Sequence, residues 1–171
     1  MIRRITKEDK QTIYSLLNKM EYYSYKYAFV NISDLEDYKN QIVYNKLISY
    51  VSYNNDKIFG VISFRNVECH NHISGVVAIK FQENKENQHL FCKDIYRAFI
   101  DISQKYTYKI IQFSSSSDNI FCPTYEKIIK KYGGRVCGRF ENNILNNDGS
   151  YSDKLTFEIK PSDILKHIKK Y

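Results

Sequence analysis

The chain has 171 residues, with 26 Lys and Arg against 19 Asp and Glu, which gives a net charge of +7. Hydrophobic residues make up 43% and aromatic residues 15% of the sequence, which excludes a disordered chain. No apolar run approaches the roughly 20 residues that a membrane-spanning helix needs. Six glycines and two prolines exclude collagen-like and linker-rich chains. The length predicts a single domain over residues 1–171.

The N-terminal part predicts a short strand followed by two helices. The strand covers residues 2–5. Thr6 is expected to cap the first helix, with Asp9 placed to answer the cap. The apolar stripe of this helix is Ile13, Leu16, Leu17 and Met20. Ser33 and Glu36 form a capping-box pattern that predicts the start of the second helix. Its inward residues are Leu35, Tyr38 and Ile42.

The hydrophobic pattern then changes to a period of two, which is typical of strands. Asn54 and Asn55 tolerate positive φ, so residues 47–53 and 57–65 predict two strands joined by a turn. Residues 73–81 predict a third strand after a polar connection.

The C-terminal part predicts helices alternating with strands. A helix is indicated by Phe91, Ile95, Ala98, Phe99 and Ile102. Residues 108–113 predict a buried strand, and residues 114–117 predict a polar turn. Pro123 begins the next helix, and Gly133-Gly134 ends it. Strands over residues 135–141 and 154–160 precede a short basic helix at 161–171.

The order of these elements predicts an α/β (α+β) fold. It has a mixed, mostly antiparallel central sheet of about seven strands with helices on both faces. Three segments of the chain resemble segments of a known protein family, and they occur in the same order as in that family. They are residues 2–9 (strand and helix cap), residues 58–62 (hydrophobic-Gly-hydrophobic) and residues 123–136 (a helix ending in Gly-Gly). On these segments the chain resembles the GNAT superfamily of N-acetyltransferases over nearly its whole length.

The resemblance implies an acetyl-CoA-dependent N-acyltransferase. The acceptor would be a primary amine of a small molecule or peptide, which attacks the thioester directly without a metal. The CoA pyrophosphate would bind at a helix N-terminus, and the pantetheine arm along a strand edge. The implied cofactor-binding residues are Ala78, Ile79, Lys80, Gln88, His89, Leu90, Phe91, Cys92 and Lys93.

The expected phosphate loop departs from the family pattern. Leu90 and Cys92 stand where the family has small residues, and no glycine occurs in residues 82–93. The alternative function is therefore a catalytically degenerate GNAT-fold protein that binds a ligand or partner.

Two residues are candidates for catalysis. Tyr125 is the candidate general acid, and packing on the apolar helix stripe is its alternative role. His70 is the candidate general base, because imidazole titrates near neutral pH. A solvated turn is the alternative for His70. With Cys69 and His72 it also offers part of a zinc site, but a fourth ligand is not evident, and we expect no metal.

The aromatic residues 22–29 fall where the family binds its acceptor. Tyr23, Tyr25 and Tyr27 would bind substrate there or form a lid packed on the sheet. Ser114 and Ser115 would contact the acyl arm or end a strand.

The remaining expectations concern location and partners. Acidic residues stand where a signal peptide would have its apolar core, which predicts a cytoplasmic protein with free thiols. The Lys residues are dispersed, so we expect neither nucleic acid nor membrane as a partner. We expect a monomer or a homodimer.

Overall fold

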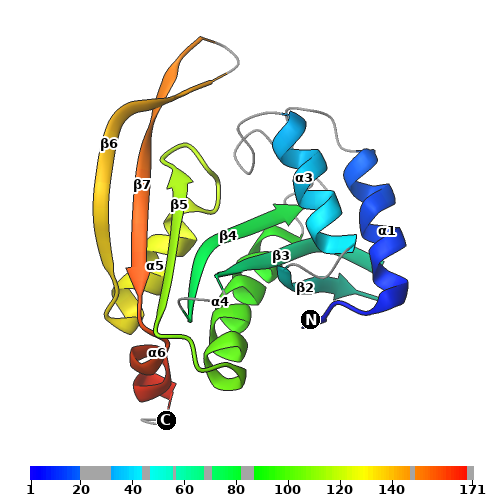
Figure 1. The fold of residues 1–171 in the computed structure, drawn as a ribbon, viewed down its shortest axis with the longest axis horizontal. Coiled ribbons are helices and arrows are strands. Elements are labelled where there is room, and N and C mark those ends of the chain that lie inside the picture. The colour runs from blue at the N-terminus through cyan, green and yellow to red at the C-terminus, as the bar shows by residue number, and fades with distance from the viewer. Residues whose placement is uncertain are drawn as a thin grey trace. The chain divides into compact units, whose positions relative to one another are not determined.

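The computed structural model describes residues 1–19, 32–43, 47–55, 57–67, 71–81, 87–146 and 149–168, without the side chains of residues 32–35, 43 and 67. Figure 1 shows its elements: β1 (Ile2–Arg4), α1 (Lys7–Asn18), α3 (Ile32–Val43), β2 (Leu47–Asn54), β3 (Lys57–Val67), β4 (His72–Lys80), α4 (Gln88–Lys105), β5 (Ile110–Ser116), α5 (Cys122–Tyr132), β6 (Arg135–Leu145), β7 (Tyr151–Ile159) and α6 (Pro161–Ile168). No helix in these ranges is long and apolar enough to cross a membrane.

The seven strands form one sheet in the order β1-β2-β3-β4-β5-β7-β6. The β1–β2, β2–β3, β5–β7 and β6–β7 pairs are antiparallel, and β4 is parallel to β5. This confirms the mixed, mostly antiparallel sheet predicted from the sequence. The chain divides into a first unit, residues 1–65 with 77–98, and a second unit, residues 66–76 with 99–171.

In the first unit, α1 and α3 cover one face of β2 and β3. The residues packed together there are Ile13, Leu17, Tyr38, Ile42, Leu47, Val51, Val61 and Ile79. A buried polar chain crosses this core, because the Tyr38 hydroxyl lies 2.8 Å from Ser63 Oγ, which lies 2.8 Å from Ser49 Oγ. Burial raises the pKa of Tyr38 well above its usual range, so this hydroxyl stays protonated.

The opposite face of β2 and β3 contacts α4. Side chains alternate along a strand, so the β2 residue Tyr50 and its partner Ile62 point away from α1 and α3. On this second face a Cβ added to Gly60 would collide with the Phe91 ring and lie 3.0 Å from the Ile79 carbonyl oxygen. The missing side chain therefore lets the first turns of α4 contact the backbone of β3.

In the second unit, α5 packs on the sheet through an aromatic cluster. The rings of Phe113 and Phe157 have centroids 5.2 Å apart, and Tyr125 of α5 lies 5.0 Å from Phe113. Phe99, from the second half of α4, lies 5.5 Å from Phe113. Gly133 ends α5 in the left-handed conformation at φ 74°, as the sequence predicts.

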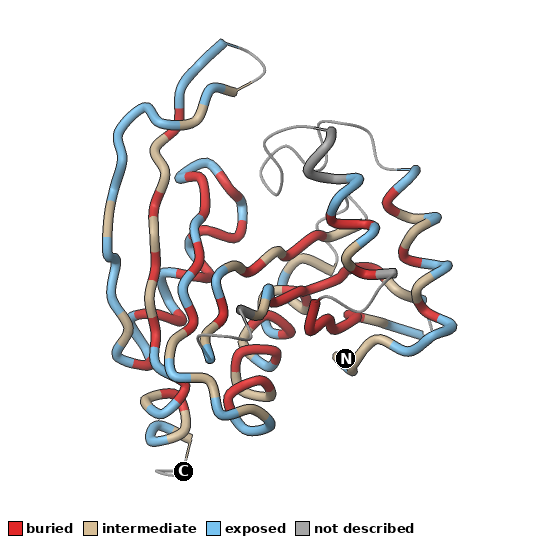
Figure 2. Tube along the Cα trace, in the orientation of Figure 1, coloured by how far each residue is buried: buried red, intermediate tan, exposed pale blue. Residues whose placement is uncertain are grey.

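The β6–β7 hairpin differs from the other strands in its exposure. β7 buries alternate residues, whereas β6 is exposed along almost its whole length (Figure 2). The pairing is also irregular, with register shifts in β6 between Val136 and Gly138 and between Phe140 and Ile144. Apolar burial therefore contributes little to holding β6 in place.

Most element predictions are confirmed in kind. The last two strands are longer than predicted, because β6 continues past residue 141 to Leu145 and β7 begins at Tyr151 instead of residue 154. Two further predictions are corrected. The Asp9 carboxylate accepts the Thr6 backbone N–H at 2.7 Å, as the predicted cap requires. Ser33 was predicted as a cap, but α3 already begins at Ile32, so Ser33 lies within the first helical turn. Residues 114–117 were predicted as a turn, but β5 continues to Ser116, because backbone pairing with β7 overrides the weak strand preference of serine.

Candidate cofactor and acyl-transfer site

In the first unit, the end of β4 and the start of α4 are fixed relative to β3. β4 ends at Lys80, and the Phe81 N–H donates to the Phe59 carbonyl oxygen at 2.8 Å. α4 begins at Gln88, and its buried residue Phe91 contacts Gly60 of β3. The carbonyl oxygen of Ile79 in β4 lies beside the same glycine. The helix N-terminus is thereby held by core packing next to the strand pair.

The N-terminus of α4 favours an anion. Its first turn contains no acidic residue, and the positive end of the helix dipole lies at this terminus. His89 and Lys93 are exposed nearby. The buried Asp94 carboxylate is paired with Arg97 at 2.8 Å, which offsets its charge. These features suit a phosphate group.

Several of the predicted cofactor residues have side chains that point into the core. Ala78, Ile79 and Phe91 are 7%, 3% and 0% exposed. They can therefore meet a ligand only through their backbone groups. Lys80, Gln88, Leu90 and Cys92 are partly exposed. Leu90 and Cys92, which stand where the family has small residues, are therefore not enclosed in the core.

In the second unit, Tyr125 lies in the aromatic cluster and is 2% exposed. This is the packing position that the apolar stripe also predicts. One turn earlier, burial raises the pKa of the Cys122 thiol to about 11, so it is protonated at neutral pH and a poor nucleophile. Cys92, Cys122 and Cys137 are free thiols.

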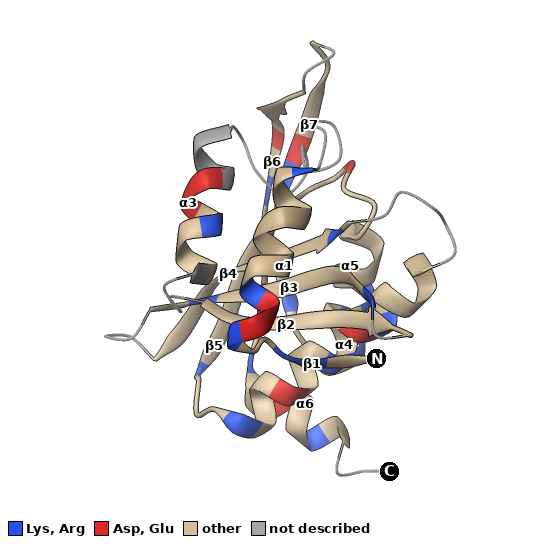
Figure 3. Cartoon of the chain, turned by 90° about the vertical axis from the view of Figure 1, so that its right-hand side faces the viewer, with Lys and Arg blue, Asp and Glu red and all other residues tan. Residues whose placement is uncertain are grey.

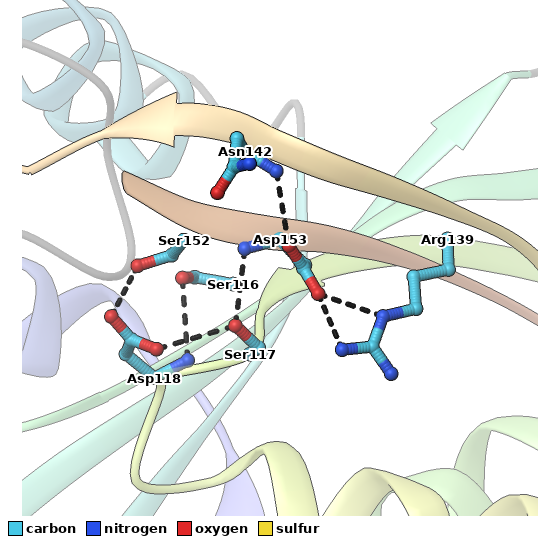
Figure 4. A network of polar contacts seen from close by, with 7 residues as sticks. All are labelled: Ser116, Ser117, Asp118, Arg139, Asn142, Ser152 and Asp153. Atoms are coloured by element: carbon cyan, nitrogen blue, oxygen red, sulfur yellow. Dashed lines mark hydrogen bonds and ion pairs between the residues drawn. The ribbon is translucent and has the colours of Figure 1, made fainter. Parts of the chain in front are cut away.

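The carboxyl end of β5 carries a polar network that the sequence analysis overlooked (Figure 4). Ser114 Oγ lies 3.1 Å from Thr156 Oγ1, and Ser115 Oγ donates to the Ser116 carbonyl oxygen at 3.2 Å. Beyond them, Asp118 and Asp153 accept several hydrogen bonds. The usable signal was an acid directly after a buried strand, at the end where open α/β sheets bind ligands.

Five predicted functional residues lie outside the described residues: Tyr23, Tyr25, Tyr27, Cys69 and His70. His72 begins β4 and is half-buried. In the part of the chain that the structure describes, no group of three or more His, Cys, Asp or Glu could hold a metal ion. Lys and Arg occur on helices and strands of both units (Figure 3).

Comparison with known proteins adds to this geometry at the level of structure. No family model matches the chain. No curated protein matches it in sequence. Solved structures match over nearly the full length. A variant of spermidine N-acetyltransferase SpeG from Vibrio cholerae has a TM-score of 0.66 at 17% identity, covering 98% of this chain and 99% of its own.

Two further structures give the same result. The Vibrio cholerae spermidine N-acetyltransferase in complex with CoA and spermine has a TM-score of 0.66 at 18% identity, with 96% of this chain and 97% of the other covered. The smu.2055 protein from Streptococcus mutans has a TM-score of 0.66 at 14% identity, with 94% and 99% covered. The chain therefore has the GNAT-like fold of these solved structures, which confirms the fold predicted from the sequence.

Proposed function

We propose that the chain is an acetyl-CoA-dependent N-acetyltransferase that acts on a primary amine. The observation that carries the proposal is the α4 N-terminus, free of acids in its first turn and fixed beside the end of β4 by Gly60 and Phe91. The full-length structural match to an enzyme solved with CoA and spermine supports the same assignment.

The cofactor assignment follows from the chemistry of CoA. Its pyrophosphate would accept hydrogen bonds from the backbone N–H groups of residues 88–90, and Lys93 would add a positive charge nearby. Its pantetheine arm is peptide-like and would pair with the backbone of residues 78–80. Within the described ranges, β4 is in register with β5 only at His72 and Ile73, which lie at the other end of β4.

Transfer would need no covalent enzyme intermediate. A neutral amine attacks the thioester carbonyl carbon, the C–N bond forms, and the C–S bond breaks as CoA leaves as a thiolate. The amine loses one proton, and the thiolate gains one. The protein would contribute positioning and backbone N–H groups for the developing oxyanion. We propose Tyr125 as the donor to the thiolate.

The first experiment measures cofactor binding. A ligand at 100 times its Kd should stabilise the fold by about 2.7 kcal/mol, so CoA should raise the melting temperature by several degrees. Free thiol release from acetyl-CoA with spermidine, a monoamine and a peptide N-terminus then tests transfer. No shift at millimolar CoA would refute the proposal.

A matched pair of variants tests where CoA binds. Gln88→Glu adds a negative charge at the N-terminus of α4, where it favours the helix but repels a phosphate. Gln104→Glu adds the same charge at the exposed last turn of α4. We expect the Kd for CoA to rise about tenfold in Gln88→Glu and to stay within about twofold in Gln104→Glu. Equal effects would contradict the placement.

The role of Tyr125 requires its own comparison. Tyr125→Phe removes only the hydroxyl and should lower kcat about a hundredfold if that hydroxyl donates the proton. Tyr132→Phe, at another buried position of the same helix stripe, is the control. An unchanged kcat in Tyr125→Phe would show that Tyr125 only packs in the core and does not donate the proton.

The second candidate function is a binding module that has lost transfer. The burial of Tyr125 and the bulky Leu90 and Cys92 favour it. CoA would then shift the melting curve, but no amine in the panel would release thiol. We propose a monomer or homodimer in either case, which light scattering after gel filtration decides.

A further inference from the structure

The distal half of the β6–β7 hairpin has little apolar anchoring. Leu145 and Tyr151 face each other across the hairpin and are 62% and 59% exposed. Residues 141–143 of β6 are exposed as well. Since buried apolar area is small here, polar contacts must determine where this segment lies.

One of these contacts closes an interruption in the ladder. Phe140 pairs with Lys154 and Ile144 pairs with Ser152, so three residues of β6 lie opposite Asp153 alone. The Asp153 carboxylate accepts the Asn142 backbone N–H at 3.0 Å. It also accepts Arg139 Nε at 2.7 Å. The carboxylate thus replaces the backbone partner that the bulge removes.

Two links join this hairpin to the end of β5. The Ser117 N–H donates to the Asp153 carbonyl oxygen at 2.9 Å, and the Asp153 N–H donates to Ser117 Oγ at 3.1 Å. In the second link, the Ser152 hydroxyl donates to Asp118 Oδ2, and Asn146 Nδ2 donates to the same oxygen at 3.2 Å. Figure 4 shows Asp118 facing Ser152 and Ser117 facing Asp153.

The second link depends on a carboxylate at residue 118. Its other oxygen, Oδ1, accepts the Ser117 hydroxyl at 3.2 Å, so both oxygens accept and neither donates. Ser152 is 3% exposed, so its hydroxyl has little access to water. An amide at this position would keep one oxygen for Ser152 and Asn146, but it would carry no charge, and its NH2 group would have to face Ser117 Oγ, which now donates to Oδ1. Hydrogen bonds to a charged acceptor are about twice as strong as neutral ones, so Asp118→Asn would weaken the second link.

We propose that Asp118 is a positioning residue that fixes the carboxyl end of β5 by holding the distal hairpin, residues 141–146 and 149–153. The segment that it fixes includes Ser115 and Ser116, at the strand end where open α/β sheets bind ligands. The effect on catalysis rests on the proposed acetyltransferase function. The effect on the hairpin does not, so the two are tested separately.

Amide hydrogen exchange tests the hairpin. In Asp118→Asn the amides of Ser117, Asn146 and Asp153 should exchange about tenfold faster than in the wild type, while Phe157 in the core is unchanged. Asp163→Asn, a carboxylate of α6 in the same unit, is the control and should leave all four unchanged. Wild-type exchange rates in Asp118→Asn would overturn the proposal.

Steady-state kinetics tests the consequence. Asp118→Asn should lower kcat about tenfold and leave the KM for acetyl-CoA within about twofold, because the cofactor groups lie in the first unit. A fall in active protein alone would also reduce CoA binding stoichiometry, which titration measures. Faster exchange with unchanged kcat would overturn the positioning role. A wild type that transfers to no amine would refute the proposed function, while exchange still decides the hairpin.

Discussion

The β2–β3 and β6–β7 strand pairs are both antiparallel, but they are stabilised by different interactions. β2 buries its first six residues because helices cover both of its faces, whereas β6 exposes nearly every side chain. In place of apolar burial, β6 has charged links from Arg139 to Asp153 and from Arg135 to Glu158. The first pair should therefore respond to side-chain volume, and the second to charge and pH.

Truncating a core strand residue should have the largest effect. Ile62 in β3 is 0% exposed, so Ile62→Ala should cost about 2–5 kcal/mol of unfolding free energy. Val136 in β6 is 51% exposed, and Val136→Ala should stay within about 0.5 kcal/mol. Urea unfolding measures both. Similar losses at the two positions would remove the distinction between the strand pairs.

Adding a methyl group to a glycine tests the same comparison in the opposite direction. Gly60→Ala would press on the buried Phe91 and the Ile79 carbonyl, so we expect a loss of about 1–3 kcal/mol. At Gly138 in β6 the added Cβ would lie 3.1 Å from the ring of Phe140, which is 52% exposed and free to move. Gly138→Ala should therefore cost less than about 1 kcal/mol. A larger loss at Gly138 would contradict this account.

Asp9 shows what an ion pair contributes when the carboxylate is buried. Its hydrogen bonds with Arg3 lower its pKa from 3.8 to about 2, which outweighs the effect of its burial. Because the pKa of Asp9 is lower in the folded state, its ionised form stabilises the fold at pH values above the unfolded-state pKa. This stabilisation is lost as the pH falls through about 2. Asp9→Asn should cost about 1–2 kcal/mol at pH 7 and flatten the stability curve between about pH 4 and 2.

Unfolding of wild type and Asp9→Asn across this pH range measures the difference. Asp37→Asn, at an exposed position of α3, is the control for losing one acid. Parallel curves for wild type and Asp9→Asn would show that the pair contributes nothing.

The sequence predicted the core helices and strands because their hydrophobic periodicity and end residues are visible within a short stretch of chain. The apolar helix stripe followed by Gly133 predicted α5, and the alternation of apolar residues predicted β2 and β3. The polar extension of β5 to Ser116 was missed because its stability comes from pairing with β7, which lies about 40 residues later in the chain. The start of α3 was displaced because Ser33 can occupy a first helical turn as well as a cap.

The candidate site was predictable in part. The proposed anion site at the start of α4 followed from the resemblance and from helix electrostatics. The apolar helix stripe already predicted that Phe91 points inwards, but the sequence could not show that the neighbouring strand residues Ala78 and Ile79 are both buried, since they point to opposite faces of the sheet. The position of Asp118 after a buried strand was visible, but its partners Asn146 and Ser152, which are 28 and 34 residues away, were not. Such contacts arise only once the hairpin has folded.

Asp153 provides the smallest and most local test of the comparison. Its pKa is lowered from 3.8, first by the backbone N–H of Asn142 and then by Arg139. The amide shift of Asn142 should therefore titrate with a midpoint below 3.8 in NMR spectra. Arg139→Gln should raise that midpoint only part of the way, because the backbone donor remains. Asn142→Gly keeps the N–H and suits the φ of 49°, so its midpoint should match the wild type. A return to the ordinary value in Arg139→Gln would assign the shift to the ion pair instead, and the hairpin would then depend on salt more than on backbone geometry.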